Sequence, residues 1–375
     1  MTTVFWISTA LVLYVYAGYP TLVAAWARLV DRQPRRAPFA PGHWPSISVI
    51  VAARNESRRL PARVVNLLSQ DYPGQREIIV VSDGSLDNPA RALAPFAPEV
   101  RLIELPSGGK PAALNAGVAA ACGEVLIFVD ARQRFASGTL QALVENLSDP
   151  SVGGVTGELI LDAEQQPGPD SPVGEGLGLY WRYEKWIRRN ESRVWSTLGA
   201  TGAIYALRRS LWRPLPAVTL LDDVLAPMRA VLGGYRVVFD DRARAFDRAS
   251  TDAATETRRK KRTLAGNYQI LAQEPRLLLP VVNPVWLQYL SHKVGRLIVP
   301  WALMALLLSS LTLIGSGAVY VAALGAQLVF YALAAAGAAL EARQRMSRVA
   351  FTFVLLNFSA IAGLMALRRG REVWR

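Results

Sequence analysis

The chain has 375 residues, of which 51% are hydrophobic and 19% are charged, and its mean hydropathy is +0.20. This composition is too apolar for an ordinary soluble protein and too charged for one wholly embedded in a membrane, so we expect a soluble domain joined to membrane spans. The net charge is +13, but the basic excess lies beside apolar segments or near residue 260, which favours membrane lipids and phosphorylated substrates over nucleic acid. The single cysteine, Cys122, excludes an internal disulfide and a cysteine-rich metal site.

An uncharged apolar run opens the chain at residues 4–26 and is long enough to cross a hydrocarbon core of about 30 Å. It predicts a membrane helix rather than a cleavable signal peptide, because the basic residues follow the run instead of preceding it. By the positive-inside rule, the next domain then faces the cytoplasm. The basic, proline-rich segment 28–45 is typical of an extended tether.

Short β-rich runs alternate with helical stretches from residue 46 onward. The runs expected as strands cover residues 47–52, 77–82, 100–105 and 125–129. The stretches expected as helices cover residues 57–70, 88–97 and 110–121. This alternation predicts an α/β domain with a mostly parallel sheet flanked by helices, which is a nucleotide-binding architecture by default. Such sheets bind ligands at the carboxyl ends of their strands.

The later part of the chain combines a mobile loop, an aromatic and basic helix and three apolar stretches. Residues 162–175 are rich in Pro, Gly, Gln and acids and are typical of a lid. Residues 180–195 mix tryptophan and tyrosine with arginine, which suits either an amphipathic surface helix or a helix that packs its aromatics into the core. The apolar stretches at 297–314, 318–340 and 349–367 are long enough to span, or nearly span, a membrane.

The basic tail at 368–375 creates a conflict in the expected topology. If the soluble domain is cytoplasmic, three full crossings place this tail outside, against the positive-inside rule. Either the last apolar segment is re-entrant or interfacial, or packing overrides the rule.

Polar residues stand at the end of each of the first two predicted strands. The first strand ends in Ala53-Arg54-Asn55-Glu56, and taken alone Asn55 and Glu56 are good helix-capping residues. The second strand ends at Asp83, an acid able to bind a ribose or base but equally suited to an ordinary turn.

Two further residues follow the third and fourth predicted strands. Lys110 opens a helix after a glycine loop, an arrangement suited to a diphosphate, although a lone loop lysine is usually only solvated. Asp130 ends the fourth strand, where a carboxylate either holds Mg²⁺ or Mn²⁺ against phosphate oxygens or simply caps the next helix. Together the four sites lie at the carboxyl ends of successive strands, which favours a shared nucleotide site.

These motifs resemble the membrane-embedded inverting glycosyltransferases of family 2, the group that includes cellulose, hyaluronan and poly-N-acetylglucosamine synthases. The motifs that carry the resemblance are Ala53-Arg54-Asn55-Glu56, Ser82-Asp83-Gly84-Ser85, Gly109-Lys110, Asn115-Ala116-Gly117 and Phe128-Val129-Asp130. The resemblance covers roughly residues 46–296 and implies a GT-A fold. The expected division is a membrane helix at 1–27, a linker at 28–45, a cytoplasmic GT-A domain at 46–280, an interfacial helix at 281–296, a transmembrane region at 297–367 and a tail at 368–375.

The resemblance also implies roles for residues further along the chain. The segment similar to the family's acceptor-binding glycine segment comprises Gly199, Ala200, Thr201, Gly202, Ala203, Ile204 and Tyr205. Asp222 and Asp223 occupy the place of the family's catalytic acids, with Asp223 matching the base. Inversion by direct displacement needs one carboxylate to deprotonate the acceptor, although two acids that merely start a helix are also physically sensible.

A basic run at 258–262 is similar to the family's leaving-group segment, with Arg259 and Arg262 as the matching cations. A run this dense is usually a solvated or lipid-facing patch, and part of it fits that description. Thr263 stands where the polymerising members place a tryptophan beneath the acceptor sugar, which makes long-chain synthesis less secure.

The resemblance therefore implies a nucleotide-sugar donor, with UDP as the expected nucleotide, and a saccharide or lipid-linked acceptor at the inner membrane, with possible assembly or export partners. Asp83 and Glu56 are expected to hold the nucleoside, and Ala53 and Asn55 are expected among the donor-binding residues. One departure is that Asp130-Ala131-Arg132 replaces the family's Asp-x-Asp, so the second carboxylate is missing. The metal is then held by Asp130 together with ligands from outside this motif, or its charge is partly replaced by that of Arg132. The alternative function is a catalytically inactive nucleotide-sugar-binding component of a polysaccharide assembly.

Overall fold

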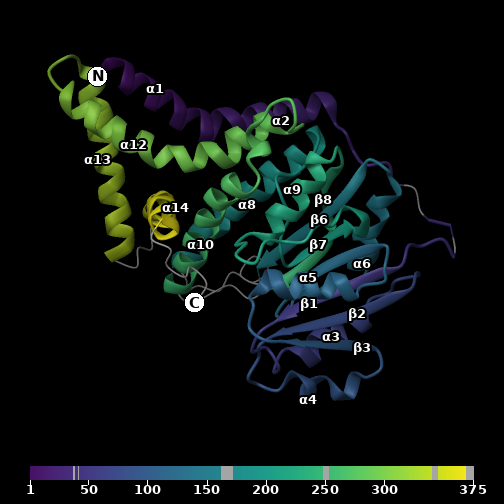
Figure 1. Ribbon diagram of the computed structural model, residues 1–375. Coiled ribbons are helices and arrows are strands. Elements are labelled where there is room, and N and C mark those ends of the chain that lie inside the picture. The colour runs from purple at the N-terminus through teal and green to yellow at the C-terminus, as the bar shows by residue number, and fades with distance from the viewer. Residues whose placement is uncertain (37–38, 41, 162–171, 248–252, 340–344, 369–375) are drawn as a thin grey trace.

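One eight-stranded sheet forms the centre of the protein (Figure 1). The structure is a computed structural model that describes residues 1–375 except 37–38, 41, 162–171, 248–252, 340–344 and 369–375. The strands are β1 (Ile47–Ala53), β2 (Arg76–Asp83), β3 (Val100–Leu105), β4 (Val125–Asp130), β5 (Arg134–Phe135), β6 (Val152–Leu161), β7 (Ile204–Arg208) and β8 (Arg236–Asp247). Their order across the sheet is β3-β2-β1-β4-β7-β6-β8-β5.

The two halves of the sheet differ in direction. Strands β3, β2, β1 and β4 are all parallel to their neighbours, which confirms the predicted parallel half. Strand β7 is antiparallel to both β4 and β6, β6 is parallel to β8, and β5 is antiparallel to β8. The result is a mixed sheet of the GT-A type, in which β1 lies between two parallel neighbours and its carboxyl end is flanked on both sides.

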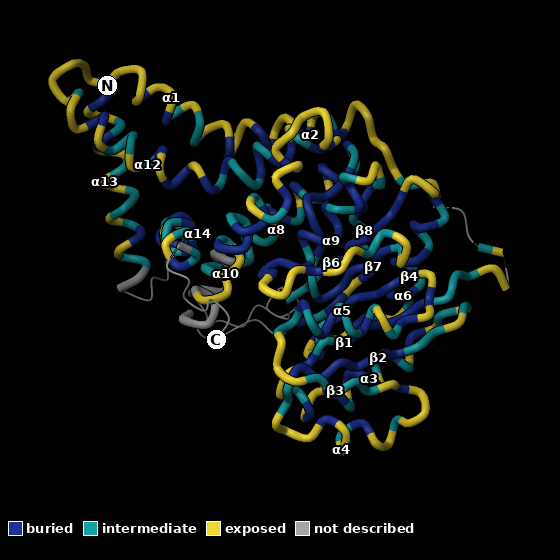
Figure 2. The backbone as a smooth tube through the Cα atoms, viewed as in Figure 1, coloured by how far each residue is buried: buried dark blue, intermediate teal, exposed yellow. Residues whose placement is uncertain are grey.

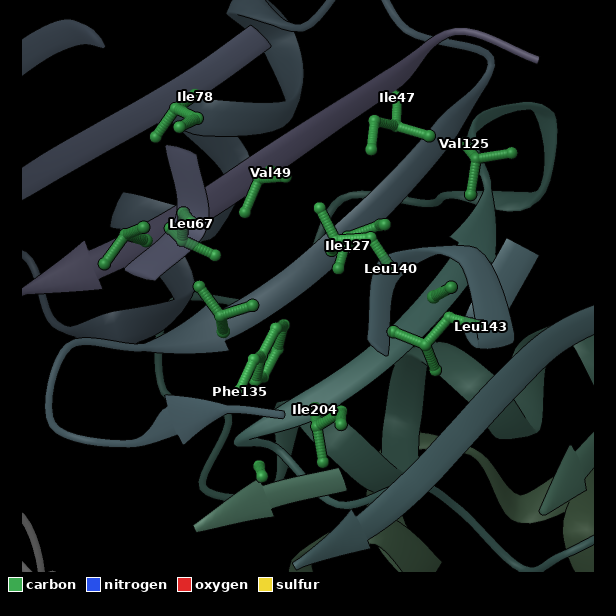
Figure 3. Close-up of a cluster of buried hydrophobic side chains, with 14 of the residues drawn as sticks. Ile47, Val49, Leu67, Ile78, Val125, Ile127, Phe135, Leu140, Leu143 and Ile204 are labelled. Carbon is green, nitrogen blue, oxygen red and sulfur yellow. The ribbon is translucent and has the colours of Figure 1, made fainter. Parts of the chain in front are cut away.

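Both faces of the parallel half are buried, and alternate side chains of one strand enter different cores. Val49 and Val51 pack with α3 (Leu60–Leu68) and α6 (Thr139–Glu145), in the cluster drawn in Figure 3. Ile50 points to the other face, toward α5 (Lys110–Ala120) and α9 (Asp222–Leu232). Because successive side chains of a strand alternate, the uninterrupted apolar runs in the sequence are what two covered faces require.

Short helices complete the α/β part of the chain. They are α4 (Pro89–Leu93), η2 (Ala94–Phe96), η3 (Asn146–Ser148), η4 (Arg209–Leu211) and η5 (Pro275–Leu278). Two long helices, α8 (Pro172–Val194) and α10 (Ala253–Gln273), leave the sheet and meet the apolar helices. The predicted lid at 162–175 falls mainly on residues outside the described part of the chain, and its last residues belong to α8.

Four apolar helical segments lie to one side of the sheet (Figure 1). Their elements are α1 (Thr2–Leu13), η1 (Tyr14–Gly18), α2 (Tyr19–Val30), α11 (Trp286–Gln288), η6 (Tyr289–Val294), α12 (Gly295–Thr312), α13 (Ala318–Ala339) and α14 (Arg345–Arg368). Each segment is long and apolar enough to cross a membrane. Figure 2 shows long exposed stretches on α1 and α13, and Trp6, Ile7 and Leu328 are among the exposed apolar side chains there. A chain with this much uncovered apolar surface is suited to a membrane.

The apolar helices differ in what they pack against. Helix α1 runs beside α12, whereas α14 packs against both α13 and α10. The approach of α14 to α10 is close, because a Cβ added to Gly363 would lie 2.9 Å from the backbone nitrogen of Ala265. Residues 286–294, predicted as part of an interfacial helix, continue directly into α12.

Candidate active site

The carboxyl ends of β1, β2 and β4 bring three of the predicted site residues to one edge of the sheet. Ala53, Asp83 and Asp130 are the last residues of these strands. The register pairs Ala53 with Ser82 on one side of β1 and Ala52 with Asp130 on the other. The loops that follow the three strands therefore lie next to one another.

Asp83 is buried beneath the loop that follows β3. Its Oδ1 accepts hydrogen bonds from the backbone N–H groups of Gly108 (2.6 Å) and Gly109 (2.9 Å), and its Oδ2 accepts another from Gly109 (3.0 Å). Arg54 lies 3.9 Å from Oδ2. The carboxylate thus fixes the loop that carries Lys110, and its predicted contact with the nucleoside stays a prediction.

The loops after β1 and β2 are tied to each other through Asn55. Its backbone N–H donates to Ser85 Oγ (3.1 Å), and its side-chain Oδ1 accepts from the backbone N–H of Leu86 (2.9 Å). Glu56 forms an ion pair with Arg59 on the first turn that follows. Asn55 and Glu56 therefore shape the edge of the predicted nucleoside site through local contacts.

Lys110 lies at the centre of a cluster of carboxylates. It begins α5, and its Nζ lies 3.1 Å from Asp130 Oδ1 and 3.5 Å from Asp222 Oδ2. Burial on its own would lower the pKa of Lys110, but Asp130, the two acids of α9 and a hydrogen bond together raise it. Lys110 is therefore a fixed positive charge at the sheet edge. It lies between Asp130 and Asp222, two predicted site residues that are far apart in the sequence.

Asp223 is the second acid of α9 and differs from Asp222 in its surroundings. Its Oδ2 accepts a hydrogen bond from the backbone N–H of Gly202 (3.0 Å). Burial and the neighbouring charge of Asp222 raise the pKa of Asp223 to about 6, against the opposing effects of nearby cations. A carboxylate with this pKa is a good general base near neutral pH.

The segment 199–205 divides into a surface part and a buried part. Thr201 and Gly202 are partly exposed, and the backbone N–H of Thr201 donates to Thr156 Oγ1 (2.9 Å). Gly199 and Ala200 are buried, and Tyr205 is 1% exposed with its ring stacked on Phe128. Thr201 and Gly202 are therefore the members of the segment that are most accessible, and the predicted acceptor contacts of the segment stay a prediction.

The basic run lies on α10, which borders the start of α9. Arg262 donates to the backbone carbonyl of Leu220 (3.4 Å), two residues before Asp222. Arg259 is exposed one turn earlier on the same helix, and its carbonyl accepts a hydrogen bond from Thr263 Oγ1 (3.0 Å). The helix thus brings both predicted cations to the border of the site, whereas contact with a leaving group stays a prediction.

Comparisons with known proteins identify the family. The sequence pattern of the family described as "Glycosyl transferase family 2" matches residues 48–213. An N-acetylglucosaminyltransferase from Rhizobium leguminosarum bv. trifolii is 34% identical over 124 residues, which are 31% of this chain and 68% of that protein. The chain belongs to glycosyltransferase family 2. Family membership makes it a glycosyltransferase by class, whereas its donor and acceptor are proposals.

Two further similar proteins align with larger parts of this glycosyltransferase. An N-acetylglucosaminyltransferase from Rhizobium meliloti (strain 1021) is 30% identical over 201 residues. These residues are 52% of this chain and 46% of that protein, so the chain spans less than half of that relative's length. A mannosyltransferase from Pyrobaculum calidifontis, solved in complex with GDP-Man and Mn²⁺, has a TM-score of 0.71 with 24% identity and covers 98% of this chain and 100% of its own. That likeness confirms the GT-A fold of the α/β part, and it extends over nearly the whole chain, including the apolar helices.

The glycosyltransferase site suits a divalent metal that shares phosphate oxygens better than a metal held wholly by protein. Asp130 has a side chain that is 33% exposed, so one of its oxygens is accessible beside Lys110. Among the described residues, no group of three or more His, Cys, Asp or Glu side chains forms a metal cage. Mg²⁺ commonly uses one or two carboxylates together with substrate phosphates, and Asp130 fits that pattern.

The arginine that replaces the second acid of the family motif is paired elsewhere. Arg132 Nη2 lies 3.0 Å from Asp247 Oδ2, and Gln133 donates to the same oxygen (2.9 Å). Asp247 is the last residue of β8, a strand that the sequence pattern did not predict. The sequence signal for this strand was the alternation of alanine and arginine at residues 242–245. The structure buries Ala243 and Ala245, as such an alternation predicts.

Sequence reasoning also missed the position of Arg188 beside the acceptor segment. Its Nη1 donates to Thr201 Oγ1 (3.0 Å), and its charge is among those that lower the pKa of Asp223 against the effect of burial. In the sequence Arg188 was one of several arginines in a mixed aromatic and basic stretch. Only the packing of α8 against the sheet distinguishes it from the others.

Proposed function

We propose that this glycosyltransferase moves a sugar from a UDP-linked donor, with inversion, to a saccharide or lipid-linked acceptor in polysaccharide or glycolipid synthesis. The observation that carries this proposal is the cluster in which Lys110 lies between Asp130 and Asp222, with Asp223 as the adjacent acid. A donor diphosphate is dianionic or more, so a half-buried lysine at the sheet edge offsets its charge. The names of the relatives make N-acetylglucosamine the first sugar to test.

In this mechanism the chain's own residues bind the donor and move one proton. Ala53, Asn55, Glu56 and Asp83 border the nucleoside, and Lys110 contacts the diphosphate. Asp223 accepts the proton of the acceptor hydroxyl as that oxygen forms a bond to the anomeric carbon on the face opposite the diphosphate. In the same step the bond from that carbon to the diphosphate oxygen breaks with its electron pair going to that oxygen, and the nucleoside diphosphate leaves.

The departing diphosphate is stabilised by cations on two sides. Lys110 is supplied by the start of α5, and Arg259 and Arg262 are supplied by α10. Mg²⁺ or Mn²⁺ bound at Asp130 would neutralise further charge on the diphosphate. Thr263 offers no aromatic platform for an acceptor sugar, which favours limited addition over long-chain synthesis.

The membrane setting follows from the four apolar segments and the distribution of charge. We place the catalytic domain, residues 46–280, on the cytoplasmic face of the inner membrane, with a membrane helix at 1–27 and a membrane region at 297–367. The contact of α14 with α10 supports an interfacial position for α14. Two crossings, by α12 and by α13, then return the chain to the cytoplasmic side of the membrane. Proteins for assembly or export of the product would bind the enzyme on that side.

The test is a donor panel with the purified full-length protein. UDP-N-acetylglucosamine, UDP-glucose and GDP-mannose are incubated with the protein and Mg²⁺ or Mn²⁺, nucleotide release is measured, and products are sized by mass spectrometry. We expect release from a UDP-sugar and products extended by one or a few sugars. Binding of nucleotide sugars without release from any donor, with membrane extract as acceptor source, would instead identify an inactive binding component.

A further inference from the structure

A cavity lies at the edge of the sheet opposite the candidate active site. Val125, the first residue of β4, lines it and pairs in register with Arg208 at the end of β7, which lines it as well. Asp130 ends the same β4, and because a strand rises about 3.3 Å per residue, the two sites are roughly 17 Å apart along it. The cavity is therefore separate from the predicted donor and acceptor residues.

The size and walls of the cavity suit an organic molecule. Its volume is about 570 Å³, within the range of roughly 300–1,000 Å³ that small-molecule sites occupy. Phe39 and Trp44, from the segment before β1, contribute two half-buried aromatic rings whose centroids lie 5.3 Å apart. Arg208 and Arg209 contribute two guanidinium groups from the end of β7. A small inorganic anion would leave most of this volume and both rings without contact.

The two arginines of the cavity keep donors for a ligand. Arg208 donates to backbone carbonyls from Nε and Nη2, which leaves its Nη1. Arg209 is exposed and donates from Nη1 to the carbonyl of Ala121 (3.2 Å), which leaves its Nε and Nη2. Among the residues that the structure describes, no carboxylate lies within ion-pair distance of either guanidinium. Two neighbouring guanidinium groups with free N–H donors are suited to phosphate oxygens.

The rest of the wall suits a ring that carries hydroxyl or amino groups. Glu124 lines the cavity, and its Oε1 lies 3.4 Å from both the backbone nitrogen and Oγ of Ser46, which is long for a hydrogen bond. Its carboxylate can therefore accept hydrogen bonds from a ligand. Aromatic side chains bind nucleic acid bases by stacking. A base, a ribose and a phosphate together match the rings, the acid and the arginines of this cavity.

The position of the cavity favours a ligand that comes from solution. The chain enters β1 from the side of the sheet that lies away from α13 and α14 (Figure 1), and the cavity borders this entry through Trp44 and Pro45. The candidate membrane helices therefore lie at the other side of the sheet from the arginines. A lipid head group is the less suitable source of the phosphate.

We propose that this cavity is a second nucleotide site, in which Arg208 and Arg209 bind the phosphate of a nucleoside phosphate and Phe39 and Trp44 contact its base. The ligand takes no part in sugar transfer, because the cavity and the catalytic cluster lie at opposite ends of β4. The inference therefore goes beyond the proposed function and does not depend on it. Nucleoside diphosphates are the probes to test, and UDP is the first of them because the proposed reaction releases it.

The test counts nucleotides bound per chain by equilibrium dialysis of radiolabelled UDP, ADP and GDP with the full-length protein in detergent. We expect at least one of them to fill a site that persists in Lys110→Gln and is weakened about tenfold by Arg209→Gln, the loss of one charge-assisted hydrogen bond. Arg101→Gln is the matched control: Arg101 is exposed, and its Nη1 donates to the carbonyl of Ala120 at 3.2 Å, but it does not line the cavity. Binding of all three nucleotides that is insensitive to Arg209→Gln, or equal weakening in Arg101→Gln, would overturn the inference.

Pyrophosphate separates the phosphate part of the site from the nucleoside part. Trp44→Leu should weaken nucleotide binding about tenfold, the loss of one stacking contact, and should leave pyrophosphate binding unchanged, which also shows that the cavity is intact. Competition by pyrophosphate as strong as that by the nucleotide would reject the nucleoside part of the proposal.

The same measurements separate this inference from the proposed function. A single nucleotide per chain that is lost in Lys110→Gln would reject the second site and leave the proposed function in place. Nucleotide binding that depends on Arg209, in a protein that releases no nucleotide from any sugar donor, would reject the proposed function and support the second site.

Discussion

The surroundings of Asp223 raise its pKa toward physiological pH. Its pKa of about 6 means that the carboxylate is largely protonated below pH 6 and largely ionised above it. Because a general base acts in its ionised form and kcat/KM reports the ionisations of the free enzyme, kcat/KM for the acceptor should rise as pH increases through about 6 and then level off. A pH profile at saturating donor, measured beside the profile of Asp223→Asn, checks this expectation.

The same variant tests the role of Asp223 directly. Asp223→Asn should lower kcat by about 10²- to 10⁴-fold, the usual contribution of general base catalysis, and should abolish the limb near pH 6. Binding of UDP by calorimetry should change little. Asp241→Asn is a suitable control, because Asp241 is half exposed and pairs with Arg189. Unchanged turnover in Asp223→Asn would remove the base assignment.

The pairing of Arg132 with Asp247 bears on metal dependence. Since this arginine already has an acidic partner, we expect Asp130 to bind the metal and chelation with EDTA to abolish transfer. Asp130→Asn should weaken Mn²⁺ binding in the presence of UDP at least about tenfold, as followed by electron paramagnetic resonance. Arg132→Ala should keep the metal requirement. Full activity in EDTA, together with its loss in Arg132→Ala, would assign the charge-neutralising role to the arginine.

At the scale of elements, the contact between α10 and the start of α9 sets the position of the basic helix. A Cβ added to Gly266 would lie 2.4 Å from Leu221 Cγ, and the backbone N–H of Leu220 donates to Gln269 of α10 (2.8 Å). A methyl group at Gly266 therefore pushes α10 away from the segment that leads to Asp222.

We expect Gly266→Ala to lower the free energy of unfolding by about 1–3 kcal/mol and to reduce transfer. Thermal unfolding in detergent and the donor assay measure the two effects. Gly325→Ala is the control, because a Cβ at Gly325 meets nothing within 4 Å and alanine favours a helix. Equal free energies of unfolding for the two variants would show that α10 and the segment before α9 can move apart at little energetic cost.

The last helix gives a prediction about topology. Helix α14 packs closely on α10, which belongs to the proposed cytoplasmic side, so we expect α14 to lie at the interface and the C-terminus to be cytoplasmic. Fusion of alkaline phosphatase and of green fluorescent protein to residue 375 distinguishes the two sides in a Gram-negative host. Fluorescence without phosphatase activity is the expected result, and the reverse pattern would make α14 a full crossing.

At the scale of the whole molecule, local patterns predicted one half of the sheet well and the other half poorly. Strands β1, β2 and β4 contain continuous apolar runs, because both faces of a parallel sheet are covered, whereas the edge strand β3 carries the exposed Arg101 and Glu104. Strands β6, β7 and β8 were not predicted. The 12 residues of β8 carry arginines and aspartates among short apolar side chains, and the partners of this strand are distant in sequence. The alternation along β8 could have indicated a strand, but no local pattern indicates that its last residue, Asp247, pairs with Arg132.

The sequence by itself determined the family, the two-part architecture and the residues at the ends of the parallel strands, because these depend on local periodicity and on motifs at fixed spacing. The tertiary structure decided which of those residues face one another. It gathered Lys110 with Asp130 and Asp222, buried Tyr205 against Phe128, and set Arg188 beside Thr201. Such contacts depend on how helices pack across the sheet, and a distance between residues far apart in the chain has no signal in either segment alone.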